Sequence, residues 1–291
     1  MIISLVFLLS LPLFASSYTF GVKESVSTLS QNHASDIARL KEETLDIVGS
    51  LDSLPYNNDV FYLRYCLEGK GVDDLKQNLA WRLGPGKAIC DAAIDSFAKA
   101  TAKSGKRNDE PVHNGAPFAS IINQYITPDN TLTTSSSQGD LIHCVRTGLI
   151  DDKALMSSLG SVQNLVDYFL YIKEVNALDA NDRSLQQDRI ASVITANDLG
   201  GTKLMGGDAS FRQALNEASK QANDLYPALN GPTLLLNLPR LMSASVKLFV
   251  STSAKVKFEH GPLQNVQNLM DISYGGKHRD EFLQQVDKLC Y

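Results

Sequence analysis

Residues 226–259 constrain the fold of this chain most, because two short candidate strands flank one amphipathic segment. Residues 233–236 are apolar and bounded by turn residues, which is the pattern of a buried strand. Asn237 can cap a following helix, and Pro239 is compatible with a first helical turn, where backbone N–H groups lack partners. Residues 255–258 can then form a second short strand. The order predicts a strand–helix–strand unit of an α/β core.

The segment between the two candidate strands is predicted to be a helix with two unlike faces. At helical spacing one face is apolar and the opposite face is polar or basic. The apolar face carries Leu241, Met242, Val246, Leu248 and Phe249, and the other carries Arg240, Ser243 and Lys247. Such a helix can cover an apolar surface while its charges meet solvent.

The rest of the chain separates into a helical part and a part where helices alternate with strands. Helical periodicity covers residues 36–48, 59–67, 72–82, 91–103, 118–126, 162–175, 211–225, 263–270 and 280–289. Short apolar runs predict strands at 141–145 and 189–196, whereas 18–33, 104–117 and 127–140 are predicted to be loops. Alternating strands and helices after residue 118 predict an α/β domain with a small, mostly parallel sheet.

The domain organisation follows from a hydrophobic leader and a polar linker. Residues 2–15 are apolar, too short for a comfortable membrane span, and precede the small residues Ala15, Ser16 and Ser17. We therefore expect a signal peptide at 1–17, rather than a retained anchor, and a soluble mature chain starting near Tyr18. A helical module at 18–104 and an α/β domain at 105–291 would follow. The leader predicts the secretory pathway or the extracellular space, with a plastid route as the alternative in an alga with complex plastids.

Composition excludes some partners and leaves disulfide pairing open. The formal charge of −5 over 291 residues makes nucleic acid an unfavourable partner. The four cysteines, Cys66, Cys90, Cys144 and Cys290, lie too far apart for a zinc motif and allow three pairings if all are bridged.

Sequence motifs for catalysis are missing. There is no Gly-x-Ser-x-Gly elbow and no phosphate-binding glycine loop. His113 and His143 have no nucleophile beside them in sequence and are interpreted as structural or solvated. We expect a protein that is not an enzyme and needs no cofactor or metal.

One ordered set of motifs resembles the CRAL-TRIO lipid-binding family, which includes retinaldehyde, tocopherol and phosphatidylinositol transfer proteins. A Tyr-Pro turn with a glycine, an Asn-x-Pro after an apolar strand, a Thr-x-x-Lys and a Tyr-Gly-Gly follow one another. They are Tyr226-Pro227 with Gly231, Asn237-Leu238-Pro239, Thr252-Ser253-Ala254-Lys255 and Tyr274-Gly275-Gly276. Leu63-Arg64-Tyr65 and Trp81-Arg82 also resemble the family's N-terminal helical module.

The resemblance implies a protein that binds and transfers a lipid or other small hydrophobic ligand in an apolar cavity. The amphipathic segment would be a gate helix over the sheet, and contact with a membrane surface would be transient. The lipid-binding residues would be Leu241, Met242, Leu248, Phe249, Thr252 and Lys255.

Two other function classes remain open, and one position differs from the phosphatidylinositol-transfer branch of the family. The same fold could serve as a non-catalytic protein-interaction module without lipid, and a secreted hydrolase is a third, less favoured class. Ala228 stands where the phosphatidylinositol-transfer branch has a glutamate that helps bind the inositol ring. Because alanine accepts no hydrogen bond from a hydroxyl, we expect a less hydroxylated ligand, such as a fatty acid, isoprenoid or simple phospholipid.

Overall fold

A computed structural model describes residues 20–49, 54, 56–102, 107–201, 207–237, 256–259, 263 and 266–291, with the backbone alone at 256–259. The predicted leader at 1–17 lies outside these residues. No helix among the described residues has the length and apolarity needed to span a membrane.

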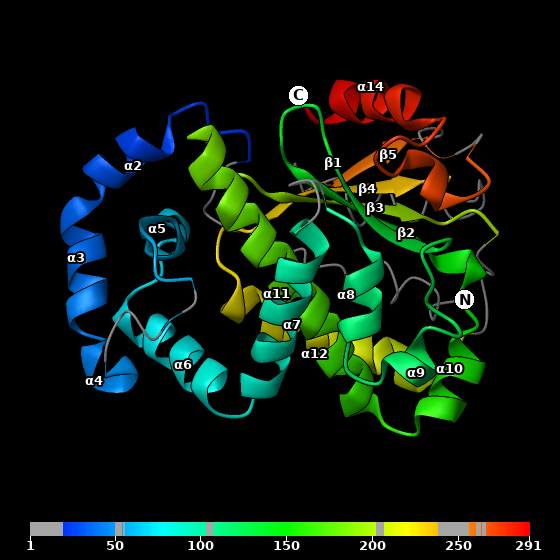
Figure 1. The fold of residues 1–291 in the computed structure, drawn as a ribbon, viewed down its shortest axis with the longest axis horizontal. Coiled ribbons are helices and arrows are strands. Elements are labelled where there is room, and N and C mark those ends of the chain that lie inside the picture. The colour runs from blue at the N-terminus through cyan, green and yellow to red at the C-terminus, as the bar shows by residue number, and fades with distance from the viewer. Residues whose placement is uncertain are drawn as a thin grey trace.

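The centre of the molecule is a five-stranded sheet whose strands lie side by side in sequence order. The strands are β1 (Thr131–Ser135), β2 (Leu141–Arg146), β3 (Val193–Asp198), β4 (Asn230–Leu236) and β5 (Val256–Glu259). β1 pairs antiparallel with β2, and all later pairs are parallel. The predicted α/β class with a small, mostly parallel sheet surrounded by helices is confirmed (Figure 1).

β1 and β3 correct two sequence predictions. β1 lies within 127–140, which the sequence predicted to be a loop. It is rich in threonine, whose branched side chain suits a strand even where hydropathy is low. β3 begins at Val193 rather than at residue 189. Arg189 lies before the strand and forms an ion pair with Asp140.

The N-terminal helices form a separate layer at the left of Figure 1. They are α2 (Val26–Asn32), α3 (Ala34–Glu42), α4 (Leu45–Val48), α5 (Asp59–Glu68) and α6 (Val72–Leu83). Their buried side chains form one cluster around the aromatic residues of α5, among them Phe61, Tyr62 and Tyr65. The helices predicted at 59–67 and 72–82 are present as α5 and α6, and Gly69 and Gly71 lie between them.

Two details of this layer differ from the prediction. α2 lies in a stretch predicted to be loose, where Ser25 caps it and Asp188 accepts hydrogen bonds from Ser27. The predicted helix at 36–48 is two helices, interrupted at Thr44, whose hydroxyl donates to the Leu40 carbonyl. α5 has its N-cap at Asn58, directly before the predicted start of the helix at Asp59.

Helices cover both faces of the sheet. The remaining ones are α7 (Lys87–Thr101), α8 (Glu110–Gly115), α9 (Ala119–Ile122), α10 (Asp152–Leu159), α11 (Val162–Gln187), α12 (Ala209–Leu225) and α14 (Arg279–Cys290). α14 lies on one face, together with the 3₁₀ helix η3 (Leu269–Ile272), and α11 and α12 lie on the other (Figure 1). α12 and α14 match their predicted ranges within two residues. At 263–270, where a helix was predicted, the described residues include only the start of η3.

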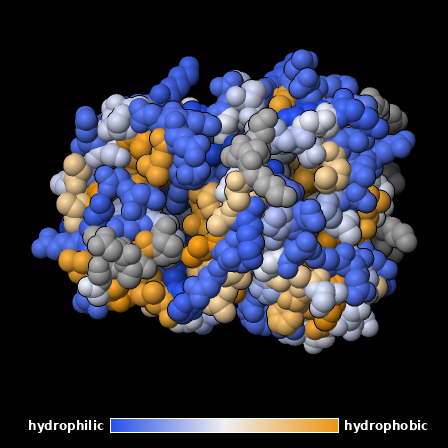
Figure 2. All heavy atoms as spheres, viewed as in Figure 1, coloured by the Kyte–Doolittle hydropathy of each residue, from blue (hydrophilic) through white to orange (hydrophobic). Residues whose placement is uncertain are grey.

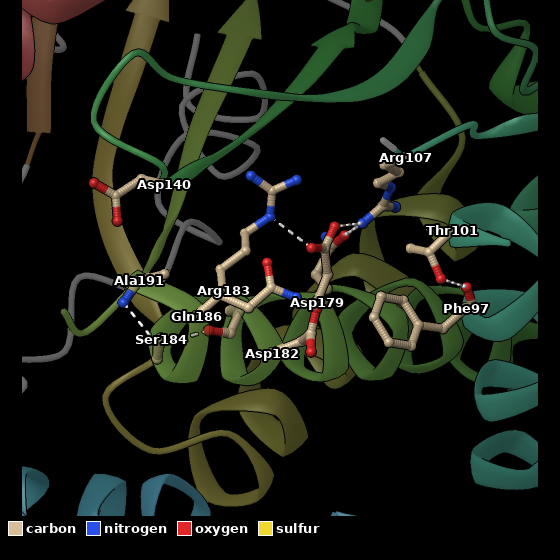
Figure 3. A network of polar contacts seen from close by, with 12 residues as sticks. Phe97, Thr101, Arg107, Asp140, Asp179, Asp182, Arg183, Ser184, Gln186 and Ala191 are labelled. Atoms are coloured by element: carbon tan, nitrogen blue, oxygen red, sulfur yellow. Dashed lines mark hydrogen bonds and ion pairs between the residues drawn. The ribbon is translucent and has the colours of Figure 1, made fainter. Parts of the chain in front are cut away.

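α11 is much longer than predicted, and α8 occupies part of the predicted linker. The sequence predicted an end near residue 175, but the helix continues to Gln187. Its second half is polar yet buried: Asp179 accepts hydrogen bonds from Arg183 and from Arg107, which follows α7 (Figure 3). Hydropathy alone does not detect a helix that is buried through paired charges.

The division at residues 104 and 105 stays a prediction. α7 lies on its N-terminal side, yet Ile89, Ala93 and Ala100 belong to the same buried cluster as the core residues of α11 and α12. On the face shown in Figure 2, hydrophilic side chains surround several separate hydrophobic patches.

Candidate ligand-binding cavity

The two faces of the sheet differ in chemistry. The face toward α14 is apolar and is buried against η3 and α14. It carries Leu132, Ile142, Cys144, Ile194, Ala196, Leu234 and Leu236. The face toward α11 and α12 is largely polar, although a parallel sheet covered by helices is usually apolar on both faces. It carries Thr131, Thr133, His143, Val145, Thr195, Asn197 and Thr233, together with the buried apolar residues Leu141 and Val193 where β2 and β3 begin.

Strand register places these polar residues in rows across the sheet. His143 is paired with Thr133 on one side and with Thr195 on the other, and Thr195 is paired with Thr233. The side chains of His143, Thr195 and Thr233 remain partly accessible, whereas residues 142, 144, 194 and 234 are at most 1% exposed. Because alternate residues of a strand point to opposite faces, the accessible ones all face one space.

That space is a cavity of about 440 Å³ between the polar face of the sheet and helices α11 and α12. Its size lies within the range of about 300–1,000 Å³ that is usual for small-molecule sites. The described residues that line it come from the sheet, both helices, the 226–228 turn and the segment that joins α5 to α6.

The helical wall opposite the sheet is mostly apolar. On α12 Phe211, Leu215, Ala218 and Ala222 follow at helical spacing and line the cavity. On α11 the lining face carries Phe169, Ile172, Lys173 and Asn176. Phe169 and Phe211 meet edge to face with ring centroids 6.3 Å apart, which joins the two helices across the cavity wall.

The N-terminal layer closes one end of the cavity at the Tyr226-Pro227-Ala228 turn. Arg64 of α5 donates to the carbonyl of Ala228 at 2.6 Å, and Glu68 accepts from its N–H at 3.1 Å. Ala228 has a left-handed backbone, with φ of 48°. These bonds from a separate layer hold the turn in place.

The second motif of the N-terminal layer also reaches this end. Arg82 pairs with Glu174 of α11 at 2.5 Å and stacks on the ring of Tyr226, 5.5 Å from its centroid. Arg64 and Arg82 are the two basic residues of the motifs that resemble the family's N-terminal module. Both bind the N-terminal helices to the layer that contains α11 and the Tyr226-Pro227-Ala228 turn.

The carboxylate of Glu68 lies beside Ala228, the position at which the sequence predicted no hydrogen-bond acceptor for a ligand hydroxyl. The sequence suggested that this turn has no carboxylate, since position 228 is alanine. The structure places the Glu68 carboxylate beside the backbone of Ala228, and both residues line the cavity. This end of the cavity therefore has a carboxylate acceptor, although residue 228 is alanine.

Burial lowers the pKa of two basic side chains in the cavity wall. Burial lowers the pKa of Lys173 to about 8, and its Nζ donates to Asn230 Oδ1 at 3.1 Å. Burial, together with the positive charge of Lys173, lowers the pKa of His143 to about 3. His143 is therefore neutral near pH 7, and its Nδ1 lies 3.0 Å from the Thr133 hydroxyl.

The residues predicted to bind lipid are not among those that the structure describes. Leu241, Met242, Leu248, Phe249, Thr252 and Lys255 all lie outside the described ranges, as does the predicted gate helix. Asn237, the predicted cap of that helix, is described, and its side-chain amide donates to Asp198 Oδ1 at 3.0 Å.

The cavity residues were missed although the sequence contained a signal for some of them. Thr195 and Asn197 are two residues apart in a short apolar run, and His143 lies within another, so polar side chains share one face of each strand. Lys173 is four residues after Phe169 and three before Asn176, which places it on their helical face. His113 is buried and does not line the cavity, in agreement with a structural role.

The described residues contain no group of three or more side chains suited to a metal ion. Cys66, Cys90 and Cys144 are free thiols. In comparisons with known proteins, neither a family model nor a curated protein matches the chain.

Proposed function

We propose that this chain binds and transfers a lipid or other small hydrophobic ligand in the cavity between the sheet and helices α11 and α12. One observation supports this most: the sheet face toward the cavity is polar and partly accessible, while its other face is apolar and filled. A polar floor opposite an apolar wall suits a ligand with one polar and one apolar part.

The energy for retaining such a ligand would come from the helical wall. Each methylene moved from water to an apolar lining contributes about 0.8 kcal/mol, so an aliphatic chain along Phe169, Phe211 and Leu215 would be held without reactive groups. The polar floor would orient the ligand rather than supply most of the affinity. The proposal assigns the cavity no catalytic step.

The CRAL-TRIO resemblance supports the same function. Tyr226 and Pro227 belong to the motif and line the cavity, and Arg64 and Arg82 dock the helical module against the end where this turn lies. The gate helix, the transient membrane contact and the secretory route remain predictions from the sequence.

Organic extraction of the purified full-length chain, followed by mass spectrometry, tests the proposal. We expect a hydrophobic molecule at close to one per chain, and transfer of that molecule between two vesicle populations. Ala218→Trp would fill the cavity from α12 and should empty the protein. Ala98→Trp on α7, which is exposed and outside the cavity, is the matched control. An empty wild-type protein that neither binds nor transfers an added lipid would favour the protein-interaction module instead.

A further inference from the structure

Lys173 is partly buried and differs in its partners from three buried arginines of this protein. Arg82 pairs with Glu174, Arg107 pairs with Asp109 and Asp179, and Arg146 lies 3.4 Å from Asp198. The partner that the structure gives Lys173 is a neutral amide, that of Asn230 at 3.1 Å. Among the described residues, no carboxylate forms an ion pair with this ammonium group.

The acids nearest to this region have other partners. Glu174 follows Lys173 in sequence but lies against Arg82. Glu68 accepts from the Ala228 N–H, and Asp224 lies 3.7 Å from Lys70. A cation taken from water without an anion is costly, and buried cations in proteins are normally paired. The Lys173 ammonium, which borders the cavity, is therefore available to an anion that enters it.

We infer that the ligand of this cavity is a single-chain amphiphile with a carboxylate head, which pairs with Lys173 while its chain lies along Phe169 and Phe211. This inference rests on the proposed function and specifies its ligand. The binding is non-covalent. The side chains of Thr195, Asn230 and Thr233 border the same cavity and can hydrogen-bond the head group.

Charge and size together favour a carboxylate over a phosphate. One ammonium matches the single charge of a carboxylate, whereas a phosphate monoester carries about −1.5 to −2 near pH 7. A diacyl phospholipid has two chains to place, and the described residues bound a cavity of about 440 Å³. A long-chain fatty acid has one charge and one chain.

The test compares two ligands that differ only in the head group. The delipidated full-length protein is loaded with Nile red, a neutral dye, which is then displaced by hexadecanoic acid or by 1-hexadecanol. We expect the acid to displace the dye at about tenfold lower concentration, since charge-assisted contacts are about twice as strong as neutral ones. Lys173→Met should remove this preference and Lys173→Arg should retain it. Lys99→Met, at a side chain that is 64% exposed, is the control for loss of one positive charge.

The outcomes separate this inference from the proposed function. Equal displacement by acid and alcohol in the wild-type protein would overturn the carboxylate assignment and leave the cavity's function standing, and this comparison needs no variant. An acid preference that persists in folded Lys173→Met protein would overturn the role of Lys173. If the wild-type protein binds neither the dye nor either chain, the proposed function fails and the inference fails with it.

Discussion

The two faces of the central sheet are built from alternate residues of the same strands, yet one face is filled by packing and the other borders a cavity. On the α14 side Ile142, Ile194 and Leu234 are at most 1% exposed and pack into a closed apolar core. On the α11 side their neighbours His143, Thr195 and Thr233 remain partly accessible and border a cavity. Filled space contributes packing energy and open space does not, so the α14 face should contribute more to stability, and we propose that the open face serves binding.

Substitution of Ile194 should have the largest effect on stability. Ile194→Ala removes buried methyl groups from the filled face and should lower the free energy of unfolding by about 2–5 kcal/mol. Urea denaturation measures this change. The folded fraction should keep its ligand content, since the cavity is on the other side. Loss of ligand without loss of stability would reverse the assignment of the two faces.

Enlarging a small residue on each side should separate packing from binding. Ala196→Leu overpacks the α14 face and should lower the free energy of unfolding by about 1–3 kcal/mol. Ala218→Leu places a larger side chain from α12 in the cavity. It should lower the free energy of unfolding by less than Ala196→Leu does, and it should weaken dye binding. Thermal unfolding and Nile red titration of both variants measure the two effects. Equal destabilisation would show that the cavity side is as tightly packed as the core.

Lys173 should make the cavity side sensitive to pH. Its pKa is lowered from 10.5 to about 8, so between these values the unfolded chain binds a proton that the folded chain does not. The ligand-free protein should therefore gain stability as pH rises from about 8 to 10.5. Below pH 8 it should carry a penalty of about 1–3 kcal/mol for the buried charge.

Lys173→Met isolates this contribution from all other titrating groups. The ligand-free variant should be more stable than the wild-type protein at pH 7, and the difference should shrink toward pH 10.5. Urea denaturation at several pH values measures it. If the difference stays constant with pH, the ammonium group is solvated rather than buried.

Thr195→Val should give the smallest change in stability and sharpen the comparison with its neighbour Ile194. The two side chains have similar shape, and Thr195 faces the cavity, so the free energy of unfolding should change by less than about 1 kcal/mol. Dye displacement by the acid should weaken if the hydroxyl contacts the head group. A loss of stability as large as that of Ile194→Ala would contradict an open cavity.

Local patterns in the sequence determined most of the architecture. Short apolar runs located β2 and β4, and helical periodicity located α5, α6, α12 and α14, because these signals depend on neighbours in the chain. β1 was missed because threonines rather than large apolar residues form it, and the end of α11 was missed because Asp179 is buried through its arginine partners. Polar residues that are buried by pairing carry no hydropathy signal.

The sequence by itself determined an α/β fold with a small, mostly parallel sheet, most of its helices and a set of motifs near the Tyr-Pro turn. Only the tertiary structure showed that His143, Thr195, Thr233 and Lys173 share one cavity, and that Glu68 lies beside Ala228. The physical reason is that strand register and helix docking bring these residues together, and both depend on contacts between residues far apart in the chain. The sequence names the side chains, but long-range packing decides which of them face the same space.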